Sequence, residues 1–105
     1  MGRVAIVAYK PKPGKEQALR ALIKKHLPCL REAGLVTDKE SFVLETKDGT
    51  IVEVFEWKSE QAIKTAHKHP KVQQMWRDYA EVSTYTPLNR LPETGNLFAD
   101  FAPVS

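Results

Sequence analysis

The sequence lacks the marks of several large protein classes. It contains a single cysteine, Cys29, which excludes an intrachain disulfide and agrees with a reducing compartment. No apolar run approaches the roughly 18 residues that a membrane helix needs, and the N-terminus has no basic region followed by the apolar region of a signal peptide. We therefore expect a cytoplasmic protein without a membrane partner.

Concentrated charge of one sign is also missing. The chain has 16 Lys and Arg against 13 Asp and Glu, for a net charge of +3, and the basic residues are scattered as singles and pairs. A nucleic-acid-binding surface gathers such residues on one face, so nucleic acid is not an expected partner. The sequence also contains no phosphate-binding loop, nucleophile elbow, paired CxxC motif or dinucleotide fingerprint.

What the sequence does contain is an ordered series of strand-like and helix-like segments. Residues 3–10 carry apolar side chains on both faces of a predicted strand, and residues 15–33 repeat Leu and Ile at helical spacing. Two further strands, 41–47 and 50–58, meet at Asp48-Gly49, a dipeptide typical of hairpin turns. The first half of the chain therefore predicts β-α-β-β.

Prolines and one serine mark the helices. Pro28 is expected to bend the first helix or divide it, because it removes a backbone hydrogen bond. Ser59 offers an N-cap hydroxyl for a second helix, and Pro70 interrupts that helix and begins the next run. A last strand is predicted at 82–87. The helical run after Pro70 has one apolar stripe, formed by Val72, Met75, Trp76 and Tyr79.

This order predicts an α+β protein, a ferredoxin-like βαββαβ sandwich whose helices cover one face of an antiparallel sheet. We expect one domain over 1–105, with a core at 3–87 and a C-terminal extension at 88–105. No helix remains to cover the second apolar face of the sheet, and leaving it in water would forgo several kcal/mol. We therefore expect a two-fold, sheet-to-sheet homodimer with the extension as its clasp.

Three segments resemble one known family. They are Lys-Pro-Gly-Lys at 12–15, Phe-Glu-Trp-Lys-Ser at 55–59, and the spacing of Ala-His, His-Pro and Trp over 66–76. In these segments the chain resembles the dimeric α/β-barrel superfamily, and within it the antibiotic biosynthesis monooxygenase-like domains. The resemblance implies a homodimer with a pocket between each sheet and its helices. Some members oxidise phenolic compounds with molecular oxygen and without metal or flavin, others degrade haem, and many have no known activity.

The candidate site residues gather around the segment 52–79, which holds both tryptophans and two of the three histidines. His67 and His69 are candidate general bases, because imidazole titrates near neutral pH. The alternative is that one caps a helix end while the other is solvated. The candidate substrate-binding residues are Trp57, Trp76, Tyr79 and Tyr9, and the alternative for Trp76 is a place in the core.

A metal site is not expected. His67 and His69 with Glu53 or Glu56 would give two histidines and a carboxylate, but the spacing lacks the regular interval of helical ligand pairs. His26 lies on the apolar seam of the first helix, and we expect it to be hydrogen-bonded at the edge of the core rather than part of a site.

Two functions of different classes follow. The first is a cofactor-independent monooxygenase, or related enzyme, acting on a small aromatic or phenolic metabolite. The second is a non-catalytic dimeric module that binds a small apolar molecule or a partner protein. No cofactor is expected, except that a haem-binding or haem-degrading protein is a further alternative.

Overall fold

The computed structural model of the protein describes residues 2–104. Its strands are β1 (Arg3–Pro11), β2 (Phe42–Glu45), β3 (Ile51–Trp57), β4 (Ser83–Tyr85) and β5 (Ala102–Pro103). Its helices are α1 (Glu16–Glu32), α2 (Glu60–Ala66) and α3 (Pro70–Val82), with short 3₁₀ turns η1 (Leu88–Arg90) and η2 (Pro92–Gly95). The strands pair antiparallel in the order β4-β1-β3-β2-β5, which confirms the predicted α+β class with an antiparallel sheet.

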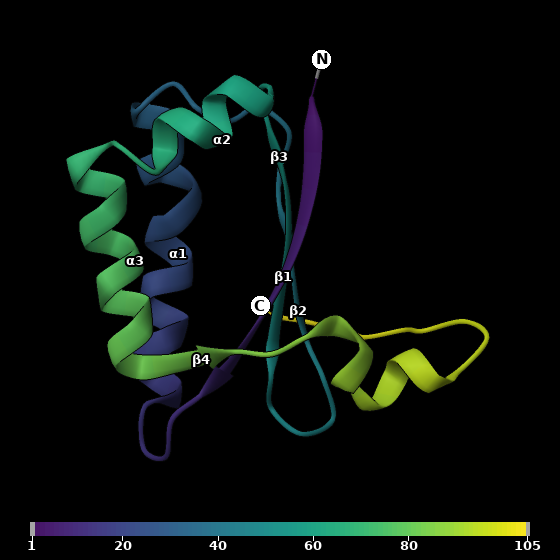
Figure 1. Cartoon of the computed structure of the whole chain (residues 1–105). Coiled ribbons are helices and arrows are strands. Elements are labelled where there is room, and N and C mark those ends of the chain that lie inside the picture. The colour runs from purple at the N-terminus through teal and green to yellow at the C-terminus, as the bar shows by residue number, and fades with distance from the viewer. Residues whose placement is uncertain (1, 105) are drawn as a thin grey trace.

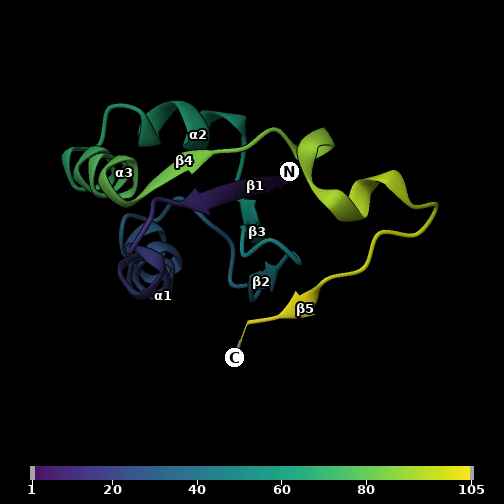
Figure 2. The same cartoon turned by 90° about the horizontal axis from the view of Figure 1, so that it is seen from below.

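The two faces of the sheet are covered differently. Helices α1 and α3 pack on one face, and the C-terminal extension crosses the other (Figure 1; Figure 2). The extension places Leu91 and Phe101 against Ala8 and Val52 on that outer face, and then adds β5 beside β2. No helix within residues 2–104 has the length and apolarity to span a membrane.

Helix α1 runs unbroken through its proline. Pro28 was expected to bend this helix or divide it, and it does not divide it, since the helix is continuous from Glu16 to Glu32. Leu27 and Leu30, on either side of the proline, are both buried in the core beneath the helix. Their packing offsets the backbone hydrogen bond that Pro28 removes.

The other helix boundaries follow the predicted chemistry. The Ser59 hydroxyl accepts a hydrogen bond from the Ala62 backbone N–H at 3.0 Å, which caps α2. Pro70 occupies the first turn of α3, and His69 before it is extended, with φ −88° and ψ 119°. Within the predicted stripe, Val72 and Tyr79 are buried, while Met75 and Trp76 pack against the core at its edge.

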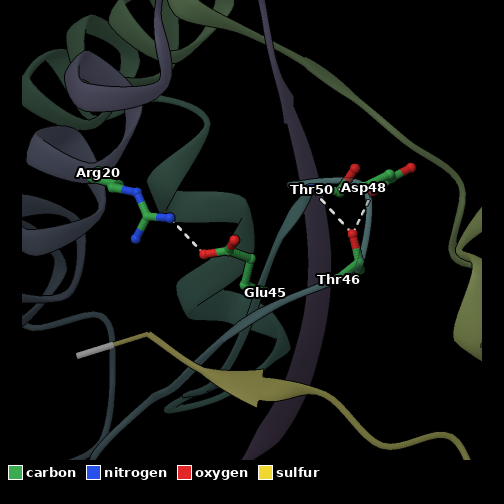
Figure 3. A network of polar contacts seen from close by, with 5 residues as sticks. All are labelled: Arg20, Glu45, Thr46, Asp48 and Thr50. Atoms are coloured by element: carbon green, nitrogen blue, oxygen red, sulfur yellow. Dashed lines mark hydrogen bonds and ion pairs between the residues drawn. The ribbon is translucent and has the colours of Figure 1, made fainter.

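The predicted hairpin joins β2 and β3. Gly49 takes φ 86°, and within residues 2–104 only glycines have a positive φ, so Asp48 does not. Asp48 contributes as an acceptor instead, because its carboxylate accepts a hydrogen bond from the Thr46 hydroxyl (Figure 3) and one from the Thr50 backbone N–H. The bond from Thr46, more than any other contact, lowers the pKa of Asp48.

Apolar side chains occupy both faces of the central strands, as predicted. Part of the outer face lies open, since Val4 is 65% exposed, Ile6 52% and Phe42 68%. Leu97 and Phe98 of the extension are also exposed. The extension thus covers one end of the outer face and leaves the other end uncovered.

Candidate functional site

Four polar side chains meet in the core between the sheet and the helices. Glu53 of β3 lies at the centre, with His26 Nδ1 at 2.9 and 3.0 Å from its two carboxylate oxygens. The Tyr9 hydroxyl of β1 donates to the Glu53 Oε1 at 3.1 Å. Tyr79 of α3 stacks on Tyr9 with ring centroids 4.6 Å apart, and meets His26 edge-on at 5.4 Å. We call these four residues the buried polar cluster.

The cluster forms where two apolar stripes are each interrupted by one polar residue. The helix-facing side of β3 presents Ile51, Glu53, Phe55 and Trp57, all buried. The core-facing side of α1 presents His26 among Leu and Ile. The sequence carries one signal of this site, because a Glu and a His stand where apolar residues would otherwise continue the two facing stripes. His26 is hydrogen-bonded as predicted, but it lies inside the core, 2% exposed, and not at its edge, and the sequence did not predict its contact with Glu53.

Burial makes this cluster energetically demanding. Glu53 has no exposed surface and His26 is 2% exposed. A carboxylate removed from water loses several kcal/mol of hydration, which only close donors can offset. Here the imidazole and one phenol supply them. The geometry therefore holds a carboxylate and an imidazole in contact, with water excluded.

The two phenols of the cluster remain protonated. Burial, and next the negative charge of Glu53, raise the pKa of Tyr9 far above its ordinary value. Burial and Glu53 likewise raise the pKa of Tyr79. Both tyrosines are therefore neutral hydrogen-bond donors at any physiological pH.

The Tyr79 hydroxyl is a donor without an acceptor. It is buried and makes no hydrogen bond within residues 2–104, although the residue is only 1% exposed. A buried polar group left unsatisfied costs about 1–3 kcal/mol. Such a group points to an additional hydrogen-bonding partner at this place.

A pocket of about 630 Å³ opens between α1 and the adjacent edge of the sheet. We call it the α1 pocket. Its volume is typical of small-molecule sites. Its apolar lining comes from Ala21, Ile23, Leu27, Pro28, Val43, Ile51 and Val104, and its polar lining from Gln17, Arg20, Lys24, Lys25, Arg31, Glu40 and Ser41.

The α1 pocket and the buried polar cluster are neighbours separated by one layer of side chains. On α1, Ile23 and Leu27 flank His26 in the helical repeat, and on β3, Ile51 precedes Glu53 on the same face. Glu45 of β2 faces the same side, where its carboxylate pairs with the Arg20 guanidinium of the pocket at 2.5 Å (Figure 3).

The predicted aromatic residues divide between two places. Tyr9 and Tyr79 belong to the buried polar cluster. Trp57 is buried beside Phe55, with ring centroids 5.3 Å apart, in the part of the core that also holds Leu27 and Leu30. Trp76 packs at the edge of that same part of the core. None of the four lines the α1 pocket within the described residues, so the pocket and the predicted aromatic set are distinct.

The predicted catalytic histidines lie at the connection between α2 and α3. His67 is exposed and edge-on to Trp76 at 5.0 Å, and its carbonyl accepts a hydrogen bond from Gln73. His69 precedes α3, and its Nδ1 is buried without a partner in residues 2–104. It lines a hollow of about 200 Å³ together with Cys29. Their catalytic role stays a prediction.

The donor sets bear on metal and haem. Among residues 2–104, no three His, Cys, Asp or Glu side chains are grouped to hold a metal ion, and Glu53 is engaged by His26. The described lining of the α1 pocket contains no His, Cys, Met or Tyr that could ligate a haem iron. The pocket residues therefore do not fit an axially ligated haem.

The chain is thus a small α+β protein with an antiparallel five-stranded sheet, and solved structures share this fold. The structure of Rv0793 from Mycobacterium tuberculosis matches with a TM-score of 0.64 and 21% identity, over 84% of this chain and 96% of that chain. A conserved protein from Methanosarcina mazei Go1 matches with a TM-score of 0.56 and 18% identity, over 81% of this chain and 87% of that chain. No protein-family model and no curated protein matches the sequence. At such identities the likeness shows the fold alone.

Proposed function

We propose that the protein is a homodimeric α/β-barrel enzyme of the antibiotic biosynthesis monooxygenase type, which oxidises a small aromatic or phenolic molecule with molecular oxygen. The carrying observation is the buried contact of Glu53 with His26 and Tyr9, beside the unpaired hydroxyl of Tyr79. The order β4-β1-β3-β2 with helices on one face supports a ferredoxin-like core. The resemblance at 12–15, 55–59 and 66–76 supports the family.

In this proposal His26 is the general base. Its imidazole accepts the phenolic or enolic proton of the substrate, and Glu53 stabilises the imidazolium that results. The Tyr79 hydroxyl donates to the oxygen anion left on the substrate, which gives the unpaired donor a partner. A substrate in the α1 pocket reaches His26 when Ile23 or Leu27 changes rotamer, since these residues flank His26 on the helix.

The overall oxidation balances without another reductant. A methylene carbon conjugated with the phenolate loses two hydrogens and gains a carbonyl oxygen, so that R₂CH₂ and O₂ give R₂C=O and H₂O. The substrate supplies all the electrons that reduce dioxygen. The protein contributes proton transfer, charge stabilisation and the exclusion of water.

Oxygen uptake tests this function. Phenols and quinols that carry an oxidisable position would be screened with wild-type protein, and then with His26→Gln and Glu53→Gln. We expect each variant to lower kcat by about a hundredfold or more, as for the loss of a general base. His67→Ala and His69→Ala, assayed in parallel, test the assignment of the base to those residues. Absence of uptake with every substrate, or full activity in folded His26→Gln, would refute the proposal.

The dimer is part of this proposal. The uncovered outer face presents Val4, Ile6 and Phe42, and a second sheet would remove them from water. Leu97 and Phe98 of the extension are available to clasp the partner.

A second candidate is a non-catalytic module that binds a small molecule. The α1 pocket favours it, because no imidazole belongs to the pocket lining described above. Saturable binding of an aromatic ligand, with no oxygen consumed by any candidate substrate, would select this function over the enzyme.

A further inference from the structure

The charged residues that line the α1 pocket are mostly cationic. Four cationic residues line it, all on α1: Arg20, Lys24, Lys25 and Arg31. Glu40 is the single acidic residue of the described lining. Opposite α1, the sheet contributes the apolar Val43 and Ile51, next to Ser41. An apolar floor beneath a cationic rim is suited to a molecule with an apolar body and a negatively charged group.

The arginines of the pocket are held in place by the protein. Arg31 donates to the carbonyl oxygens of Asp38 at 3.3 Å and Lys39 at 3.1 Å, and the Glu40 carboxylate lies 3.9 Å away. Its Nε is buried and makes no hydrogen bond within residues 2–104. Arg31 therefore presents an ordered guanidinium whose Nε–H is among its unused donors.

The surplus of charge fits one negative charge better than several. Arg20 is already paired with Glu45 at 2.5 Å, and Glu40 lies near Arg31. Lys24 and Lys25 are the exposed cations that remain at the rim. A carboxylate matches this balance, and it can accept hydrogen bonds from both an ammonium and a guanidinium.

We propose that the α1 pocket binds a small amphipathic carboxylate, with its apolar body on Ile23, Leu27 and Val43 and its carboxylate between Lys24 and Arg31. The inference rests on the proposed function in taking this pocket as the place where substrate binds. It adds that the substrate is an organic acid. Binding itself requires neither oxygen nor His26.

Calorimetric titration tests the inference with matched acids and amides. The aromatic arm compares 1-naphthoate with 1-naphthamide, and the aliphatic arm compares octanoate with octanamide. We expect at least one acid to bind about tenfold more tightly than its amide, as hydrogen bonds to charged groups imply. The preferred arm identifies the apolar body. Added salt should reduce this preference, because the rim cations are solvent-exposed.

Two variants locate the site. Lys24→Gln should weaken binding of the acid by about threefold to tenfold and leave the amide unchanged. Ala21→Phe, which fills the pocket from an exposed position of α1, should abolish binding of both. Ala18→Phe is the matched control, since Ala18 is an exposed α1 residue outside the pocket lining.

Equal binding of acid and amide, absence of binding by either acid, or unchanged binding in Ala21→Phe would each overturn the inference. The reaction is judged separately. Acid-selective binding without oxygen uptake would support the inference and refute the proposed enzyme. Oxygen uptake with neutral phenols only would support the proposed enzyme and refute the inference that its substrate is an organic acid.

Discussion

At the scale of single residues, the buried polar cluster costs more free energy of burial than an apolar core at the same place would. Glu53 and His26 form a nearly inaccessible hydrogen-bonded pair, and buried polar pairs can often be replaced by apolar residues without loss of stability. Tyr79 adds a buried hydroxyl without an acceptor. A core selected only for packing would have no need of these groups, which favours a functional role.

Comparing a variant that lacks one member of the Glu53–His26 pair with a variant that lacks both tests whether the pair serves stability or function. Glu53→Ala should lower the free energy of unfolding by about 1–3 kcal/mol, because it leaves the His26 imidazole buried without its hydrogen-bond partner. The double variant His26→Leu with Glu53→Met should recover most of that loss and still lack oxygen uptake. Urea denaturation of wild type, Glu53→Ala and the double variant compares their stabilities. A double variant as unstable as Glu53→Ala would show that the pair is structural.

Tyr79→Phe tests the unpaired hydroxyl. The substitution keeps the ring stacked on Tyr9 and removes the unsatisfied group, so we expect stability to rise by about 1 kcal/mol. Oxygen uptake should fall, because the donor to the substrate anion is lost. The urea midpoint and the initial rate give the two readouts. A loss of stability would mean that the hydroxyl has a hydrogen-bond partner in solution.

The same tyrosines predict alkaline sensitivity. Tyr9 and Tyr79 have folded-state pKa values above the ordinary value of 10.0, which applies to the unfolded chain. Stability is therefore complete below about pH 10 and falls above it, by about 1.4 kcal/mol per pH unit for each tyrosine. Urea denaturation between about pH 9 and 11 measures the slope. Tyr9→Phe should reduce it, whereas Tyr85→Phe should change it less, since Tyr85 is 59% exposed.

At the scale of elements, local chemistry predicted most of the structure. The strand and helix order, the Ser59 cap, the start of α3 at Pro70 and the turn at Gly49 all follow from residues within a few positions of each other. The continuity of α1 through Pro28 does not, because Leu27 and Leu30 gain their stabilisation from distant parts of the chain.

The cluster required information that the sequence pattern does not carry. Glu53 pairs across the sheet with Val7, and Tyr9 lies two residues further along that strand. The carboxylate meets His26 only when α1 packs on this face with one particular rotation. Periodicity places each residue on a face but gives no register between separate elements. Tyr9 and Tyr79 were recognised as candidate site residues, while Glu53 and His26 were assigned other roles.

The Ser59 cap gives a local test. Ser59→Ala should destabilise the protein by about 1 kcal/mol, because the Ala62 backbone N–H loses its acceptor. Ser59→Asp should restore most of the loss, since its carboxylate can accept the same bond near the positive end of the helix. The shift of the urea midpoint measures both. Equal stability of Ser59→Ala and wild type would exclude a contribution from the cap.

At the scale of the whole molecule, the uncovered outer face predicts the assembly state. Wild-type protein should sediment at micromolar concentration with about twice the chain mass of 11.9 kDa. Ile6→Asp, at the open end of β1, should yield the single-chain mass, because a buried carboxylate at a two-fold interface appears in both copies. Ala80→Asp, on the exposed side of α3, is the control. A wild-type mass near that of one chain would refute the dimer.

The position of β1 also has a consequence for synthesis on the ribosome. The first strand to be made is central in the sheet, between β3 and β4, so neither of its neighbours exists when it emerges. One edge of β1 pairs only once residues 51–57 have been made, and the other only once residues 83–85 have been made. The nascent chain therefore holds an apolar strand with unpaired backbone groups until residues 51–57 and 83–85 have been made, and such a strand can be captured by chaperones.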